Sequence, residues 1–282
     1  MSKIVRNIEL EEKVKAWYKW RTGGELHLDP PITFNEKINW LKIYDSTPLK
    51  GLCADKYEVR QYVTSILGED LFIPLLGVWE KFEDIDFDTL PNRFVLKATH
   101  GSGWNIIVTD KNQFNCEEAR RKFHDWLASD YGSYSYELHY SYIKPRIIAE
   151  AFIEELEHSS LTDYRFFCYN GRVREVWVDT NSGTPQHTRS VFDQDFNKKD
   201  VQSTWGDGGV VLTKPTQYKR MVEIANQLSS PFVFVRVDLY EVEGKVYVGE
   251  LTFTPTAGLG TYKPPEWGIE CGNMLDLTPL MG

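Results

Sequence analysis

The sequence contains no apolar run that approaches the roughly 20 residues needed for a membrane-spanning helix. Its N-terminus also lacks the apolar segment of a secretory signal peptide. These two absences predict a cytoplasmic protein without a transmembrane segment.

The chain also has few cysteines and no net positive charge. The four cysteines form no CxxC pair and have no metal-like spacing with histidine, which predicts reduced thiols: Cys53, Cys116, Cys168 and Cys271. The formal net charge of −9 argues against general nucleic-acid binding.

The N-terminus is a local exception to the acidic character of the chain. Basic residues gather there around the apolar Leu10, Val14, Trp17 and Tyr18, and they are Lys3, Arg6, Lys13, Lys15, Lys19 and Arg21. A packed helix with a solvated basic face is the favoured interpretation. Peripheral contact with an anionic membrane surface is the alternative that the pattern leaves open.

What the sequence does contain is a pair of strand-like segments that carry charge. From Phe232 to Tyr240, aliphatic residues alternate with a second set that includes Arg236 and Asp238. Because charged residues are costly inside a buried strand, the aliphatic face is predicted to be core and the polar face to look into a site. A return strand is predicted from about Val246 to Thr252.

The length of the turn between these strands sets which residues face each other. A three-residue loop over 243–245 would place Asp238 opposite Glu250, and Arg236 opposite Thr252, whereas a two-residue loop would not. Two facing carboxylates repel unless a cation lies between them, and Mg²⁺ prefers such hard oxygen ligands together with phosphates. An ordinary ion pair with Arg236 is the alternative.

A second segment with candidate site residues lies between residues 92 and 108. The strand-like run Asn92 to Ala98 holds Lys97 among apolar residues, and a glycine-rich segment, 99–104, then leads into another apolar run. The segment lacks the Gly-Lys-Ser/Thr ending and following helix of a Walker P-loop, and it opens no helix as a Rossmann fingerprint does. It is typical of a flap whose N–H groups close over phosphates, or of an ordinary hairpin turn beside a solvated lysine.

Three further segments complete the pattern. Asp55 and Lys56 are predicted to open a helix that Gly68 ends. The strand 146–154 offers backbone groups and an apolar pocket for a base, although a plain buried strand is the alternative. The run 163–169 alternates like a strand and is followed by the hairpin turn signal Asn170-Gly171.

The chain is predicted to be an α+β protein with three parts. Residues 1–90 form an N-terminal helical region that includes a capping box at Thr33 and Glu36. Residues 91–155 form a small lid unit with a helix near Cys116 to Ser129. Residues 156–282 form an antiparallel sheet with a helix around Tyr218 to Leu228, and this part holds the metal.

In this order, the segments resemble the ATP-grasp superfamily, in particular carboxylate–amine ligases of the D-alanine:D-alanine ligase kind. The resemblance spans about residues 50–262 and rests on Asp55-Lys56, on Lys97 with Gly101 and Gly103, on Glu150 to Ile153, and on Arg236-Val237-Asp238 with Glu250-Leu251-Thr252. Thr252 departs from the pattern, since an asparagine usually binds metal there. The amino-acid sequences of the segments 97–103 and 249–255 are similar to those of the TupA-like branch of this superfamily. Proteins of this branch are encoded in bacterial surface-polysaccharide gene clusters.

The resemblance implies two α+β subdomains that clasp ATP, and it implies amide formation through an acylphosphate. The implied nucleotide-binding residues are Lys56, Lys97, His100, Gly101, Ser102, Gly103, Glu150, Ala151, Phe152, Ile153 and Asp163. The implied ligands of Mg²⁺ or Mn²⁺ are Asp238, Glu250 and Thr252, and the implied catalytic residues are Arg236, Lys97 and Arg165.

The substrates of such a ligase are a carboxylate and an amine. The loop-like stretch 181–189, with His187 and Arg189, and the segment after the second strand, with Lys263, are the candidates for the lining of the acceptor pocket. The candidates for a cationic carboxylate clamp are Arg165, Arg189 and Lys263. A solvated surface position is the alternative for each. The branch suggests a uronic acid on a glycan, or an amino acid, as the carboxylate partner.

Two other functions remain open at this point. A metal-dependent glycosyltransferase that uses a nucleotide sugar would need a DxD motif, which 84–86 and 86–88 spell within a charge-rich connector. A nucleotide-binding protein without turnover is the second alternative, and Thr252 favours it. The sequence gives no indication of the oligomeric state.

Overall fold

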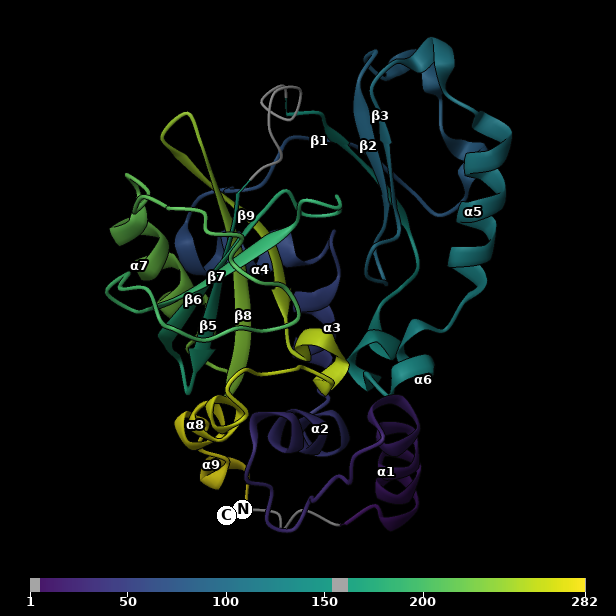
Figure 1. Cartoon of the computed structure of the whole chain (residues 1–282). Coiled ribbons are helices and arrows are strands. Elements are labelled where there is room, and N and C mark those ends of the chain that lie inside the picture. The colour runs from purple at the N-terminus through teal and green to yellow at the C-terminus, as the bar shows by residue number, and fades with distance from the viewer. Residues whose placement is uncertain (1–5, 154–161, 282) are drawn as a thin grey trace. The chain divides into compact units, whose positions relative to one another are not determined.

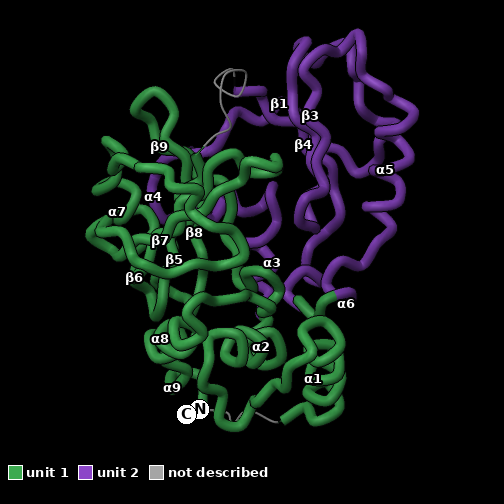
Figure 2. The backbone as a smooth tube through the Cα atoms, in the orientation of Figure 1, with its two compact units in different colours: residues 1–46, 135–137, 155–282 green, residues 47–134, 138–154 purple. Residues whose placement is uncertain are grey.

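The chain divides into two compact units in the computed structural model, which describes residues 6–153 and 162–281 (Figure 2). Unit 1 combines residues 1–46, 135–137 and 155–282, and unit 2 combines residues 47–134 and 138–154. The three-part division predicted from the sequence stays a prediction. Lys3 of the basic stretch, Glu154 at the end of the predicted strand 146–154 and the predicted boundary at 155 lie outside the described residues.

Unit 2 is built on a four-stranded antiparallel sheet with the strand order β1-β4-β2-β3. Figure 1 labels β1, β2 and β3 of this sheet. The core of unit 2 contains Phe94 and Leu96 of β2 together with Phe123 of α5. The helix predicted near Cys116 to Ser129 is therefore confirmed. The elements are α3 (Pro48–Ala54), α4 (Val59–Leu67), β1 (Leu75–Trp79), η1 (Phe82–Asp84), η2 (Phe87–Thr89), β2 (Phe94–Ala98), β3 (Asn105–Val108), η3 (Lys111–Gln113), α5 (Cys116–Ala128), α6 (Tyr131–Ser135), η4 (Leu138–Tyr142) and β4 (Ile147–Ala151).

The helix predicted to open at Asp55 begins later than expected. Asp55 is the C-cap of α3, and its Oδ1 accepts hydrogen bonds from the N–H groups of Tyr57 (2.8 Å) and Glu58 (3.3 Å). Lys56 therefore lies in the turn that precedes α4 and not in a first helical turn, because Asp55 already satisfies the N–H groups that follow it. Gly68 ends α4 with a left-handed φ of 73°, as predicted.

Unit 1 is built on a five-stranded antiparallel sheet with the strand order β7-β6-β5-β8-β9 (Figure 1). Helix α7 packs against β5, β6 and β8, and it matches the helix predicted around Tyr218 to Leu228. The elements are α1 (Ile8–Thr22), α2 (Phe34–Tyr44), β5 (Asp163–Tyr169), β6 (Arg172–Thr180), β7 (Thr188–Asp193), α7 (Tyr218–Ser229), β8 (Phe234–Val242), β9 (Lys245–Thr252), η6 (Pro255–Gly258), α8 (Glu266–Met274) and α9 (Thr278–Met281).

A hydrophobic core of unit 1 lies on the face of this sheet opposite helix α7. There Phe34 of α2 packs against the rings of Phe167, Tyr169 and Phe234, with centroid distances of 5.1–6.3 Å. The capping box predicted at Thr33 and Glu36 begins α2 and is confirmed. Helix α2 is thereby fixed beside the part of the sheet that carries charge.

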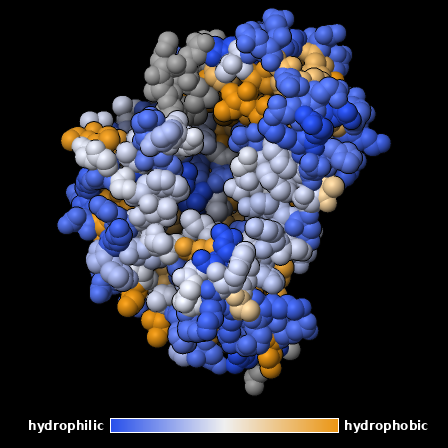
Figure 3. Space-filling view, turned by 45° about the vertical axis from the view of Figure 1, so that its right-hand side comes forward, coloured by the Kyte–Doolittle hydropathy of each residue, from blue (hydrophilic) through white to orange (hydrophobic). Residues whose placement is uncertain are grey.

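The lysines of α1 pair with acidic neighbours. Lys13 pairs with Glu9 at 2.7 Å, and Lys19 pairs with Glu25 at 2.6 Å. No helix among the described residues is long and apolar enough to cross a membrane. Hydrophobic side chains reach the face seen in Figure 3 in scattered groups among hydrophilic ones.

Candidate functional site

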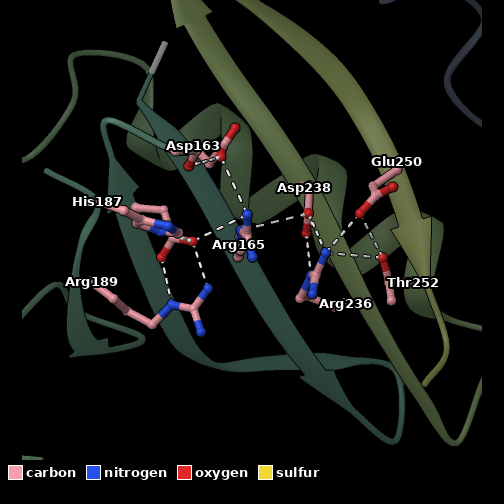
Figure 4. A network of polar contacts seen from close by, with 10 residues as sticks. Asp163, Arg165, His187, Arg189, Arg236, Asp238, Glu250 and Thr252 are labelled. Carbon is pink, nitrogen blue, oxygen red and sulfur yellow. Dashed lines mark hydrogen bonds and ion pairs between the residues drawn. The ribbon is translucent and has the colours of Figure 1, made fainter. Parts of the chain in front are cut away.

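The charged residues of the unit 1 sheet gather on one face, across neighbouring strands (Figure 4). On β8, Arg236 and Asp238 point to this face, while Val235, Val237 and Leu239 are fully buried under the other face. The prediction of an aliphatic core face and a polar site face is confirmed.

The pairing of β8 with β9 has the predicted register but not the predicted turn. Glu243 and Gly244 form a two-residue turn with φ values of 49° and 74°, so the expectation of a three-residue loop is wrong. The register then shifts between Asp238 and Leu239, because Gly249 is an extra, bulged residue on β9. The bulge brings Asp238 opposite Glu250.

Gly249 permits this bulge because it has no side chain. A Cβ at this position would lie 2.7 Å from the ring of Tyr240. The bulge also sets Arg236 opposite Thr252, as predicted.

Arg236 connects the residues of this cluster. Its Nε and one terminal nitrogen donate to the two carboxylate oxygens of Asp238 at 2.7 and 2.6 Å. The same terminal nitrogen donates to Glu250 at 2.8 Å and to Thr252 at 3.1 Å, and Thr252 in turn donates to Glu250 at 3.0 Å. In this conformation the ion pair that the sequence left open is formed.

Burial makes the ionised form of Asp238 costly. It raises the pKa of Asp238 to about 6, although Arg236 and Arg165 act in the opposite direction. Burial also works to lower the pKa of Arg236, but Asp238 and Glu250 outweigh it and raise that pKa. The arginine is therefore a permanent cation, while the charge of Asp238 is only partly compensated.

The oxygen atoms of this cluster fit a divalent cation. Asp238, Glu250 and Thr252 present two carboxylates and a hydroxyl from paired strands, and the Glu250 side chain is 42% exposed. No three His, Cys, Asp or Glu side chains gather as a metal site among the described residues. A Mg²⁺ ion that takes several ligands from phosphate and water needs only one or two carboxylates, so the donor set suits it.

A second group of charges surrounds Asp179 on β6, a residue that the sequence analysis did not single out. The Asp179 side chain is fully buried, and Arg189 of β7 binds it with two hydrogen bonds of 2.6 Å. His187 and Arg165 also reach it, both at 3.1 Å. Burial works to raise the pKa of Asp179, but Arg189 and Arg165, together with the hydrogen bond from His187, outweigh burial and lower it.

The candidate clamp residues differ in their surroundings. Arg189 was expected in a loop, but β7 begins at Thr188, so its side chain is buried in the sheet and held by Asp179. Trp205 stacks on His187 at 4.2 Å and lies under the guanidinium of Arg189 at 4.6 Å. Lys263 is exposed and forms a backbone bridge with Gln202. Their roles toward a substrate stay predictions.

Arg165 and Asp163 link the two groups of charges. The terminal nitrogen of Arg165 lies 3.3 Å from Asp163, and its Nε lies 3.9 Å from Asp238. Asp163 also accepts a hydrogen bond of 2.7 Å from Ser182. The charges therefore run from Arg189 on β7 to Glu250 on β9 along one face of the sheet.

In unit 2, Lys97 projects from β2 as the sequence predicted. Its ammonium is paired with Glu150 of β4 at 2.5 Å, and Glu150 also binds Arg60 at 2.7 Å. Glu150 was expected to contact a base. In this conformation its carboxylate instead holds the two cations.

The glycine-rich loop lies between β2 and β3, and the prediction of strand, loop and strand is confirmed. Lys56 donates to the carbonyl of Gly101. His100 is buried, its Nε2 lies 2.9 Å from the carbonyl of Trp126, and burial lowers its pKa. A Cβ on Gly101 would lie 2.4 Å from the ring of Trp104, so this glycine lets the indole pack against the loop.

The remaining predicted nucleotide residues lie near these positions in the sequence. Ser102 is exposed, and Gly103 has a left-handed φ of 73°. Ala151 ends β4, and Phe152 lies under the guanidinium of Arg93 at 4.1 Å. Ile153 is half-buried. Contact of these residues with a nucleotide stays a prediction.

The two sheets carry the segments on which the resemblance to the ATP-grasp superfamily rests, namely a lysine beside a glycine-rich loop on one sheet and the Arg-x-Asp and Glu-x-Thr strands on the other. A family model described as TupA-like ATPgrasp matches residues 36–276. The chain belongs to this TupA-like ATP-grasp family, so the family and the fold class predicted from the sequence are confirmed.

Solved structures with similarity to this chain include amino-acid ligases. The D-alanine–D-alanine ligase from Bacillus anthracis complexed with ATP is 15% identical, with a TM-score of 0.49, over 84% of this chain and 67% of that chain. The D-alanine–D-alanine ligase from Helicobacter pylori is 13% identical, with a TM-score of 0.44, over 81% and 60% of the two chains. The L-amino acid ligase from Bacillus licheniformis is 17% identical, with a TM-score of 0.46, over 81% and 49%. No curated protein matches the sequence.

Proposed function

We propose that the protein is an ATP- and Mg²⁺-dependent carboxylate–amine ligase. The observation that carries the proposal is the cluster of Arg236, Asp238, Glu250 and Thr252 on two paired strands of a member of the TupA-like ATP-grasp family. The finer proposal is that the enzyme joins an amino acid or amine to a carboxylate of the uronic-acid type in the synthesis of a bacterial surface polysaccharide. The resemblance of its motifs to the TupA-like branch supports this finer proposal.

The proposed reaction has two steps. An oxygen of the substrate carboxylate attacks the γ-phosphorus of ATP, ADP leaves, and an acylphosphate forms. The amine nitrogen then attacks the acyl carbon, and the tetrahedral intermediate loses inorganic phosphate and a proton to give the amide. Both steps build negative charge on oxygen, which fixed cations stabilise.

Each cluster has a proposed role in this chemistry. Asp238, Glu250 and Thr252 would hold Mg²⁺, which when bound neutralises charge on the phosphates. Arg236 already forms hydrogen bonds to two carboxylates and would stabilise oxygen charge on the transferring phosphoryl group or the intermediate. These bonds hold its planar guanidinium in place before substrate arrives.

The unit 2 residues are proposed to bind the nucleotide. Lys56 and Lys97 would hold phosphates, with the N–H groups of the loop 99–104 beside them. Lys97 is preorganised because Glu150 fixes its ammonium at 2.5 Å. Residues 150–153 are proposed to contact the adenine and Asp163 the ribose.

The proposed carboxylate clamp is cationic. Arg165 and His187 both contact the buried carboxylate of Asp179, so their positions are set before a substrate binds. Arg189 completes this cluster, and exposed Lys263 is the proposed outer contact. A substrate carboxylate would be attracted by the positive charges of Arg165, Arg189 and Lys263.

The DxD segment gives no support to the glycosyltransferase alternative. Asp86 caps the short helix η2, where its Oδ1 accepts a hydrogen bond of 3.1 Å from the N–H of Asp88. Such a cap explains the aspartate without a metal.

The test of the proposed function is ADP release in screens of carboxylates paired with amines. Lys97→Ala and Glu250→Gln should abolish release, because each removes a charge that the transition state needs. Asp86→Asn should change release little and serves as the matched control. Normal turnover in the Glu250→Gln variant would refute the ligase proposal.

A further inference from the structure

Polar side chains of α2 hold the chain segment that follows β9. Three of them are spaced four and three residues apart and so share one face of the helix. Each donates a hydrogen bond to a backbone carbonyl of this segment: Asn35 to Gly260 (2.8 Å), Asn39 to Gly258 (3.0 Å) and Lys42 to Ala257 (2.9 Å). The segment, residues 254–260, begins two residues after Thr252, the last residue of the proposed metal site.

The backbone of this segment is strained. Thr256 and Ala257 have φ values of 51° and 53°, in the left-handed region that residues with a Cβ rarely occupy. Gly258 continues this conformation at 73°, and a Cβ there would lie 2.6 Å from the amide nitrogen of Asn39. Such strain persists only where surrounding contacts impose it, and the bonds from α2 are such contacts.

One of these contacts requires the burial of the Lys42 ammonium, which is unfavourable for the free energy of folding. Its side chain is fully buried, with the ammonium 4.2 Å from the centre of the Trp17 ring and 3.1 Å from Oδ1 of Asn39. Burial lowers the pKa of Lys42 to about 7, although Glu137 acts in the opposite direction. An apolar residue would fill this space at less cost in folding free energy, so stability alone does not explain the lysine.

The other end of the segment is held by a buried carboxylate. Thr254 and Ser135 both donate to Glu137, and burial raises the pKa of this carboxylate. The turn after β9 is thus fixed at Thr254 by Glu137 and at residues 257–260 by α2.

We propose that Lys42 and Asn39 are positioning residues for the ligase reaction, and that they act by fixing the turn 254–260 beside the strand end that carries Glu250 and Thr252. The inference rests on the proposed function. Neither residue contacts Asp238, Glu250 or Thr252. Each acts through the backbone of the turn 254–260, which follows β9. A displacement of about 1 Å in reacting groups costs about 100-fold in rate, so a loosened turn should impair turnover while the fold persists.

Helix α2 also supplies a matched control. Lys37 donates to the carbonyls of Gly272 and Leu275, at 2.7 and 2.6 Å, at the end of α8. Lys37→Met therefore removes a lysine of the same helix, and with it hydrogen bonds to backbone carbonyls that lie outside the turn. Asn39→Ala is the second test variant should Lys42→Met fail to fold.

The experiment measures amide hydrogen exchange and ADP release on the full chain. In Lys42→Met and Asn39→Ala, exchange at residues 254–260 should rise and kcat should fall about tenfold or more. The KM for ATP and the Kd for Mg²⁺ with a non-hydrolysable ATP analogue should stay within about threefold of wild type. Lys37→Met should leave both kcat and exchange at residues 254–260 unchanged.

Two results would overturn the positioning role. One is wild-type kcat in Lys42→Met or Asn39→Ala despite faster exchange of the turn. The other is an equal loss of activity in Lys37→Met, which would indicate a general effect of stability. A wild-type protein that releases no ADP with any acid and amine refutes the ligase proposal itself, and the positioning role falls with it, so the two failures are distinguishable.

Discussion

At the residue scale, the proposed metal site combines one buried carboxylate with one that is partly exposed. Asp238 is buried and has both oxygens bound to Arg236, whereas Glu250 is partly exposed on the neighbouring strand. A cation that approached from solvent would therefore meet Glu250 first and gain from the charge of both carboxylates. This arrangement suits a metal that arrives together with a nucleotide.

The charge of Glu250 should matter for the binding of metal and nucleotide together. Glu250→Gln keeps the size of the side chain but removes a hard anionic ligand. We expect the Mg²⁺-dependent part of the affinity for an ATP analogue to fall by about tenfold or more, as judged by calorimetric titration with and without Mg²⁺. Glu243→Gln, at the exposed turn of the same hairpin, should bind like wild type. Equal affinity in both variants would exclude Glu250 from the metal site.

Asp55 should make stability depend on pH. Its carboxyl is buried, which raises its pKa to about 6. Because the folded pKa lies above the unfolded value of about 4, its contribution to stability is complete below about pH 4 and is lost as pH rises to about 6. This loss amounts to about 3 kcal/mol of unfolding free energy.

Asp55→Asn removes the proton equilibrium but keeps an oxygen for the N–H of Tyr57. Relative to wild type, the variant should gain about 3 kcal/mol of unfolding free energy between pH 4 and pH 7, in urea denaturation at a series of pH values. Exposed Asp84→Asn is the control. Parallel pH profiles for wild type and Asp55→Asn would contradict the expectation.

Some residues of the site could be found in the sequence and some could not. Arg236 and Asp238 stood out because they interrupt an aliphatic strand pattern. Asp179 gave a similar signal at the end of the run 173–178, but its partner Arg189 lies in a stretch with loop composition, so the pair was missed. Lys42 gave no signal, since a lysine in a helix is most often solvated.

At the element scale, the bulge in β9 is the feature that aligns the site. A two-residue turn alone would give a different register, and the extra residue Gly249 corrects it. The sequence therefore led to the right pairing of Asp238 with Glu250 through the wrong turn. A bulge formed by one glycine in a short strand cannot be distinguished by pattern from a longer loop.

Gly249→Ala should test the bulge. The added Cβ would lie 2.7 Å from the Tyr240 ring, so strand or ring must move, at a cost of about 1–3 kcal/mol in unfolding free energy. Binding of Mg²⁺ with the ATP analogue should weaken as well, because the same shift displaces Glu250. Gly206→Ala is the control, since its Cβ would meet nothing within 4 Å and its φ is not left-handed. An unchanged melting temperature in Gly249→Ala would contradict this account.

Elements with strong local signals were predicted well. The capping box gave the start of α2, and Asn170-Gly171 gave the turn between β5 and β6. Helix α3 was missed, although Thr47 and Pro48 form a cap and an N1 proline at its start. Strand β7 was missed because its partner β6 lies across a loop, and the pairing is a tertiary property.

At the scale of the whole molecule, two sheets with separate cores carry the two sets of proposed ATP residues. The family match covers most of the chain and includes parts of both units. Order of motifs along the chain was enough to predict the fold class, because each motif lies on its own strand or loop. The charged strip of unit 1 could not be predicted in full, since its members come from strands β7, β6, β5, β8 and β9, whose order in space differs from their order in sequence.

The central claim is that the chain binds ATP with Mg²⁺ through the proposed nucleotide-binding residues, which include Lys97, and the proposed metal ligands Asp238, Glu250 and Thr252. The most direct test is thermal unfolding of wild type and Lys97→Ala with Mg²⁺ and a non-hydrolysable ATP analogue, compared with Mn²⁺ and UDP-sugars. The analogue should stabilise the wild type, by about 2.7 kcal/mol at a hundredfold excess over Kd, and Lys97→Ala should lose this gain. Stabilisation by a nucleotide sugar alone would contradict the claim and favour a glycosyltransferase.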